Sequence, residues 1–348
     1  MPRLADLVAS PAWLLHEMDI GADRVAFLPV ARGLVERANF LDGREEIAVG
    51  EPVAVPVAEA LGLTPPAPHG PDRFIFHVSF CGSTLLTRML ARPGKVLALR
   101  EPHGLVGLAD WKTQQDQRAD PRVPRLADFA RASLRPAWRQ GERVIVKPSN
   151  WCNNLLPELC VAGMRPLFIG IGPRAFLRAV FRGNRERIAF TLLAARHFAA
   201  RPADMALLAA ALRDLSHSLD RAAAMALIAL HLQLRGFRAA MAAGGWGSEH
   251  MTSYERIVAA PFEAARAASR ALDLGLDANE LAEGVARSIG RDAKLAGCGF
   301  SAENQESVDD AIEHAHGRHF DAAMAWAAAT VPGWAPEAAV PERLSEAG

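Results

Sequence analysis

The chain lacks the features that mark membrane, secreted and nucleic-acid-binding proteins. Its 348 residues carry 39 Lys and Arg against 39 Asp and Glu, so a net charge of zero gives no support for a nucleic-acid or anionic-membrane partner. The longest uncharged apolar stretch, 222–234, is too short to span a bilayer. Residues 1–18 contain Asp6 and Glu17 where a signal peptide needs an uninterrupted apolar region. We therefore predict no nucleic-acid partner and no membrane span.

Cysteine is also scarce, and its spacing excludes the common disulfide and zinc frameworks. No C-x-x-C pair occurs, so we predict reduced, mostly buried thiols in a cytoplasmic protein. The segment HAHGRH (314–319) contains three histidines, but their spacing is not i, i+4 and no cysteine or carboxylate completes a set, so we predict no metal. The four cysteines are Cys81, Cys152, Cys160 and Cys298.

What the chain does have is a series of apolar, β-branched runs that alternate with helical patterns. This alternation predicts an α/β fold with a parallel sheet flanked by helices. We assign it to one domain, residues 71–348, with a short further strand before Ser253. The strands are expected at 74–80, 95–102, 143–149 and 165–173, and the main helices at 85–91, 153–162, 174–200, 204–243 and 261–272.

The first 70 residues form a separate prediction. Two short strands are expected at 24–30 and 46–57, and the breaker-rich stretch TPPAPHGPD (64–72) reads as a linker. Residues 1–70 are therefore predicted to be a small β-containing extension, whose role the sequence leaves open.

Polar residues follow several of the predicted strands. Because the carboxyl ends of parallel strands meet at one edge of the sheet, where α/β proteins bind ligands, we expect four segments to converge there. These are residues 80–84, 101–103, 147–150 and 170–174.

The segment FCGSTLL (80–86) has the layout of a phosphate-binding loop. Gly82 allows close approach of the backbone, and the hydroxyls of Ser83 and Thr84 add donors at the start of a helix. It is not a Walker A loop, because the first glycine position is His77 and the lysine position is Ser83. The residues leave two interpretations open, an anion-binding loop and a strand–turn–helix corner capped by Ser83.

The stretch from this loop to a strand ending in Glu-Pro resembles the sulfotransferase superfamily. The likeness is greatest to its bacterial and tyrosylprotein-type branches and covers about residues 71–275, including SYERIVAAPFEAARAASRALDLGL (253–276). The resemblance implies a P-loop fold that transfers a sulfuryl group from 3′-phosphoadenosine 5′-phosphosulfate (PAPS) to a hydroxyl. It also implies donor contacts from Phe80, Cys81, Gly82, Ser83, Thr84 and Leu85.

The chain departs from the family at three donor contacts. The cation of the loop is Phe80 here, and the Arg and Ser expected to hold the 3′-phosphate are Ile171 and Ala179. Arg174 and Arg178 recur at helical spacing past a strand end and are candidates to bind the donor instead, the alternative being a solvated basic face. Lys147, at the end of a buried strand, is predicted to point into the cleft and supply the missing cation, the alternative being an ammonium that extends to solvent.

Glu101 is the predicted catalytic base. It lies nineteen residues after Gly82, a placement that matches the catalytic glutamate of the resembling branches. Its position at the carboxyl end of a buried strand predicts a raised pKa. The alternative is an ion pair with Arg100 or Arg174 that fixes the loop, and His103 is a second candidate base.

For two groups of polar residues we expect structural roles. Asn150, Asn153 and Asn154 are predicted to cap a helix, the alternative being that they line the acceptor cleft. Tyr254, the single tyrosine, and Glu255 are carried over from the resemblance as a structural motif.

Three functions remain open at this point. The first is sulfuryl transfer from PAPS to a small molecule or peptide with a hydroxyl. The second keeps the fold and transfers phosphate from a nucleotide, which requires Mg²⁺ and a carboxylate to hold it. The third is an inactive scaffold that binds a protein or peptide. The sequence also leaves the acceptor and a homodimeric state open.

Overall fold

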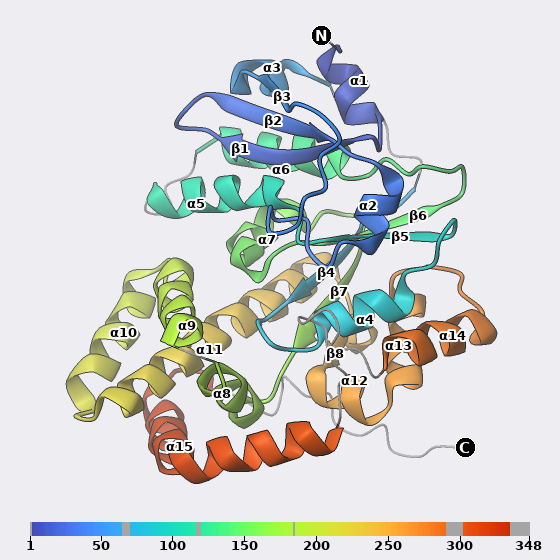
Figure 1. Ribbon diagram of the computed structural model, residues 1–348. Coiled ribbons are helices and arrows are strands. Elements are labelled where there is room, and N and C mark those ends of the chain that lie inside the picture. The colour runs from blue at the N-terminus through green and yellow to red at the C-terminus, as the bar shows by residue number, and fades with distance from the viewer. Residues whose placement is uncertain (1, 65–69, 116–119, 184, 290–301, 335–348) are drawn as a thin grey trace.

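The computed structural model describes residues 2–64, 70–115, 120–183, 185–289 and 302–334. It confirms the predicted α/β class with a parallel sheet flanked by helices (Figure 1). Helices cover both faces of this sheet, so its strands are buried almost throughout, and this is why they appear in the sequence as continuous apolar runs. The strands are β4 (Arg73–His77), β5 (Val96–Arg100), β6 (Arg143–Lys147), β7 (Arg165–Gly170) and β8 (Met251–Ser253).

The strand order is β5-β6-β4-β7-β8, so the first strand of the sheet lies at its centre. One group of helices packs around α4, which directly follows β4, and a second group packs around α11 on the other side (Figure 1). The first group is α4 (Ser83–Leu90), α13 (Pro261–Ala271) and α14 (Ala278–Ser288), with α12 (Tyr254–Ala259) beside α13. The second group includes α6 (Arg122–Ser133), α7 (Leu156–Leu159), α8 (Pro173–Phe181) and α11 (Ser218–Gly244).

This arrangement creates a topological switch at the end of β4. The chain leaves β4 toward the α4 group, whereas it leaves the neighbouring strands β6 and β7 toward the α11 group. Crossovers between parallel strands are right-handed, so opposite directions along the sheet place the connections on opposite faces. The loop after β4 therefore lies in a crevice between diverging connections, which is where open α/β sheets bind their ligands.

Long helices extend the side that contains α11. Alanine and leucine fill the buried face of α11, which ends where Gly245 adopts the left-handed conformation at φ 66°. None of the helices in the described part of the chain is both long and apolar enough to cross a membrane. The additional helices are α9 (Arg185–Phe198), α10 (Pro202–Asp214) and α15 (Ala302–Thr330).

The first 64 residues form a three-stranded antiparallel sheet in the order β1-β2-β3. It packs on α5, α6 and the short 3₁₀ helix η1 and shares one hydrophobic core with the parallel sheet (Figure 1). Sequence analysis predicted strands near β2 and β3 and missed β1. The elements are α1 (Leu4–Ala9), β1 (Trp13–Asp19), β2 (Arg24–Pro29), α2 (Arg32–Arg37), β3 (Val53–Val55), α3 (Val57–Gly62), η1 (His103–Leu105) and α5 (Val106–Gln114).

Two glycines allow β1 to lie directly on η1 and α5. A Cβ atom on Gly104 would lie 2.8 Å from the carbonyl oxygen of Leu15, and one on Gly107 would lie 2.1 Å from that of Met18. No side chain fits at either position without moving the backbone. The contact of β1 with η1 and α5 therefore depends on backbone packed against backbone.

The cysteines behave as predicted where they are described. Cys81 and Cys152 are buried free thiols, and Cys160 is a partly buried one. Cys298 lies outside the described residues.

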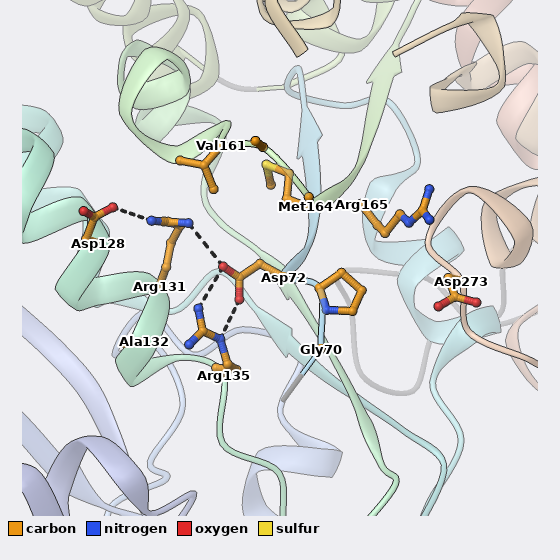
Figure 2. A pocket seen from close by; sticks show the side chains of 13 residues that line it. Gly70, Asp72, Asp128, Arg131, Ala132, Arg135, Val161, Met164, Arg165 and Asp273 are labelled. Atoms are coloured by element: carbon orange, nitrogen blue, oxygen red, sulfur yellow. Dashed lines mark hydrogen bonds and ion pairs between the residues drawn. The ribbon is translucent and has the colours of Figure 1, made fainter. Parts of the chain in front are cut away.

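A cavity of about 700 Å³ lies at the amino ends of β4 and β7, at the opposite edge of the sheet from the predicted site (Figure 2). Four of its charged groups, those of Asp72, Asp128, Arg131 and Arg135, are paired with one another. The Asp72 carboxylate accepts hydrogen bonds from Arg135 at 2.7 and 3.0 Å and from Arg131 at 3.3 Å, as Figure 2 shows. Because these charges neutralise each other, we assign no ligand to this cavity.

Candidate active site at the carboxyl ends of the strands

The loop after β4 has the backbone of an anion-binding turn. Gly82 has φ 74° and Phe80 has φ 64°, a left-handed conformation that costs a non-glycine residue about 1–3 kcal/mol and that concentrates at functional sites. α4 begins at Ser83, whose side chain is buried together with that of Thr84. The first N–H groups of a helix lack partners within it and attract anions. The loop is thus shaped to receive a negatively charged group.

Tyr254 and Glu255 hold this loop and the loop after β7. A Cβ atom on Gly82 would lie 3.3 Å from the Tyr254 ring, so the ring lies directly against the turn. Glu255 accepts a hydrogen bond from the N–H of Gly172 at 2.8 Å. The two residues thus contact the loops that follow β4 and β7.

Cys81 contributes no nucleophile to the loop. Burial raises the pKa of its thiol to about 12, so the sulfur stays protonated.

Three charged or titratable side chains meet at the ends of three adjacent strands. Lys147, at the end of β6, is completely buried, and its Nζ atom lies 2.6 Å from Glu101 Oε1 and 3.4 Å from His77 Nε2. Glu101 follows β5 and His77 ends β4. Lys147 therefore does not extend to solvent, and it links the strand that carries the predicted base to the strand that carries the loop.

The pKa of Glu101 corrects the prediction made from the sequence. Burial alone raises it, as predicted, but the neighbouring positive charges, first that of the Lys147 ammonium, together with the hydrogen bond from Lys147 lower it by more. The pKa of the carboxyl therefore lies below its ordinary value, and Glu101 is ionised at neutral pH. Its ion-pair partners are Lys147 and Arg44, not Arg100 or Arg174.

The backbone at Glu101 is strained as well. Its φ is 54°, and its N–H donates to the carbonyl oxygen of Lys147 at 2.6 Å. A glutamate held in the left-handed region needs surrounding contacts that determine its position, and those contacts here come from Lys147. The geometry aims one carboxylate at a defined place on the rim.

His77 is neutral and firmly held. Burial first, and then the neighbouring charge of Lys147, lowers the pKa of its ring to about 4. Its Nδ1 lies 3.0 Å from the oxygen of Val78, and its Nε2 lies 3.0 Å from that of Pro148. The ring thus adds no charge to compete with Lys147 for the carboxylate.

Part of the first 64 residues covers this cluster. Arg44 stacks its guanidinium on Phe40 at 3.9 Å from the ring centroid and reaches Glu101 Oε2 at 3.6 Å. The backbone of Leu41 donates to the oxygen of Arg100 at 2.7 Å, which fastens this segment to the end of β5. The N-terminal unit therefore supplies side chains to the site. His103, the second candidate base, contacts the N-terminal unit, with its ring centroid 5.5 Å from that of His16.

The predicted capping role of the asparagines is wrong. Asn153 donates to the oxygen of His77 at 3.0 Å and to Gln233 at 2.9 Å, and Asn154 donates to the oxygen of Ala109 at 2.8 Å. These amides join η2 (Asn150–Leu155) to β4 and α5. The residue that caps η2 is Ser149 instead. Asn150 likewise approaches Gln233, at 3.4 Å.

The two predicted donor ligands, Arg174 and Arg178, have different surroundings. Arg174 pairs with Glu313 and with Asp321 of α15, the latter at 2.6 Å, so its charge is already balanced. Arg178 lies near Tyr254, where its charge opposes the burial that raises the pKa of the phenol. Within the described residues its buried Nε atom has no hydrogen-bond partner.

Sequence reasoning missed a third arginine, Arg187. Its guanidinium lies 4.9 Å from the centroid of the Phe80 ring, a cation–π contact with a residue of the loop after β4. Arg187 also neighbours Arg182, whose charge, after burial, helps to lower the pKa of Arg187. The helical spacing that singled out Arg174 and Arg178 applies only within α8. Arg187 lies in the next helix, α9, so that spacing could not identify it.

The comparisons add no relative. No family model, no curated protein and no solved structure matches the chain. The function is therefore argued from the site alone.

Proposed function

We propose that the chain is a sulfotransferase-like enzyme that moves a sulfuryl group from PAPS to the hydroxyl of a small molecule or peptide. The observation that carries the proposal is the placement of the loop Phe80–Ser83 and the ionised Glu101 at one edge of the sheet, joined through Lys147 and His77. An anion loop supplies the donor site, and a carboxylate beside it supplies a base.

The residues of the loop fit the phosphate end of the donor. The backbone from Phe80 to Leu85, with the hydroxyls of Ser83 and Thr84, would hold the 5′-phosphate. Arg187, above the Phe80 ring, would balance the charge that the loop itself does not balance. Arg178 has a buried, unpartnered Nε atom among the described residues and would contact the second phosphate.

The chemistry of the chain's own residues then follows. Bound PAPS supplies the activated sulfuryl group. Glu101 orients the acceptor hydroxyl and takes its proton as the oxygen bonds to sulfur and becomes acidic. Lys147 keeps the carboxylate ionised and fixed between turnovers, and the arginines stabilise the negative charge that develops on the departing phosphate.

The kinase-like alternative is less well supported. Transfer from a nucleotide triphosphate needs a carboxylate that can bind Mg²⁺. Glu101, which follows β5 at this edge, is paired with Lys147 and Arg44, and binding Mg²⁺ there would require both pairs to break. Glu255, which follows β8, accepts the N–H of Gly172.

Calorimetric titration with adenosine 3′,5′-bisphosphate tests the donor site, with ATP and GTP plus Mg²⁺ as comparators. We expect saturable binding of the bisphosphate without Mg²⁺. Binding of ATP only, and only with Mg²⁺, would favour phosphate transfer. Binding of none of these nucleotides would overturn the enzyme proposal in favour of a scaffold.

The base is tested by sulfuryl transfer from labelled PAPS to a panel of phenols, alcohols and tyrosyl peptides. We expect Glu101→Gln to lower the rate on any accepted substrate by roughly 10²–10⁴-fold, the usual contribution of a general base, with bisphosphate binding retained. The matched control is Glu158→Gln, which removes another partly buried glutamate–lysine pair, with Lys112 at 2.7 Å. Equal rates for Glu101→Gln and wild type would refute the assignment.

A further inference from the structure

A second cluster of polar residues lies where α11 begins, against the middle of α15. It consists of His217, the residue that caps α11, Asp220 in its first turn, and His319 on α15. One ligand atom from each of the three lies within 4.8 Å of the others. The segment HAHGRH contains His319, but its partners come from about a hundred residues earlier in the chain, so spacing within the segment could not reveal them.

The two ring nitrogens of His319 have different hydrogen-bond partners. Its Nε2 atom accepts from Arg318 Nε at 3.3 Å, so its proton is on Nδ1, which donates to Asp220 Oδ1 at 2.5 Å. The pair therefore places Nδ1 of His319 and Oδ1 of Asp220 side by side, with one proton between them. His217 also uses Nδ1 as an acceptor, for the N–H of Leu219 at 3.2 Å, which leaves its Nε2 at the exposed side.

We propose that His217, Asp220 and His319 bind one divalent transition-metal ion of the Zn²⁺ class. Two imidazoles and one carboxylate are a common protein ligand set for zinc and leave one position for water. The site is independent of the sulfuryl-transfer proposal.

The surroundings allow the small movements that binding needs. The rings of His217 and His319 are stacked, with centroids 4.5 Å apart, so one ring must turn to aim both nitrogens at a single ion. His217 is exposed and can turn. The ion would replace the proton between Nδ1 of His319 and Asp220, and the ring proton would move to Nε2 of His319 once the exposed Arg318 turns to solvent. His319 is buried and Asp220 is 19% exposed, so these two provide the fixed part of the site.

The ion would connect α15 to the start of α11, close to the α15 carboxylates that pair with Arg174 and Arg182. On α15, Glu313 and Asp321 flank His319 and pair with Arg174, and Asp309 pairs with Arg182. An ion held between the two helices would thus fix the helix that engages these arginines.

The test is calorimetric titration of Zn²⁺ into the full, untagged chain after removal of metal with a chelator. We expect one ion per chain, with Co²⁺ giving the visible absorption of a four-coordinate site with nitrogen ligands. His217→Ala, which changes an exposed side chain and leaves the core intact, should weaken Zn²⁺ binding by roughly 10-fold or more, and His319→Gln by at least as much. Saturating Zn²⁺ should also raise the melting temperature of the wild type but not of these variants.

The matched control is His314→Ala, because His314 is an exposed histidine of the same helix outside the cluster. It should bind Zn²⁺ as tightly as the wild type. Failure of the wild type to bind Zn²⁺, or loss of binding in His314→Ala but not in His217→Ala, would overturn the proposal.

Discussion

Replacing Lys147 by methionine tests the physical basis of the site most directly. Methionine keeps most of the volume of the side chain and removes its charge, which leaves the Glu101 carboxylate largely buried without its main partner. Breaking a buried ion pair in this way costs about 3–5 kcal/mol of unfolding free energy at neutral pH. Arg44 cannot compensate, because it is 58% exposed and 3.6 Å away.

The loss should depend on pH with a definite sign. In the wild type the folded pKa of Glu101 lies below 4.5, so the pair stabilises the fold above that value and its contribution disappears as pH falls through the folded pKa. In Lys147→Met the main opposing charge is gone and the exposed Arg44 offsets burial only weakly, so we expect the folded pKa to rise above 4.5, which penalises the variant at neutral pH and relieves it on acidification. The difference in stability between the two proteins therefore shrinks as pH falls.

Urea denaturation at about pH 7.5 and about pH 4.5 measures this difference. The double variant Glu101→Gln/Lys147→Met should recover part of the stability lost in Lys147→Met, because it removes the unpaired charge. Lys112→Met is the matched control, since its partner Glu158 is also 15% exposed but Lys112 itself is not completely buried, and its loss should be smaller. A difference that is small, or equal at both pH values, would refute the reasoning.

Two further substitutions test the contact of α5 with β1 and the role of Arg187 at the loop after β4. Gly107→Ala should cost roughly 3 kcal/mol of stability, because its Cβ would lie 2.1 Å from a backbone oxygen, whereas Gly62→Ala, with open space around it, should be nearly neutral in denaturant melts. Arg187→Gln should weaken bisphosphate binding by about 10-fold and reduce its salt dependence, whereas Arg196→Gln on the exposed face of α9 should not. Unchanged binding in Arg187→Gln would remove that residue from the donor site.

The class of fold and the position of the site could be read from local patterns. Continuous apolar runs predict buried parallel strands because helices must cover both faces. β5, β6 and β7 lie within the expected runs, and β4 begins one residue before its run, at Arg73. Gly82 marks the turn because its φ of 74° favours glycine. Convergence of Glu101, Lys147 and the loop at one rim follows from strand polarity alone.

The partners of each charge could not be read in this way, because they come from distant segments. The residues near Glu101 in the sequence do not indicate that Lys147 is its partner. They also do not predict that positive charge outweighs burial and lowers the pKa of Glu101. Arg174 is engaged by α15, and Arg187 reaches the loop from a different helix than the one the arginine stripe predicted.

Strand order and helix packing decided the rest. Placing β4 at the centre of the sheet brings His77 beside Lys147, and the hydrogen bond from Leu41 to Arg100 fastens the segment whose Arg44 reaches the carboxylate. Local sequence determines where a chain turns and which faces are apolar, since these depend on neighbouring residues. Which charges share one low-dielectric site depends on contacts between segments far apart in the chain, and only the packed tertiary structure decides those.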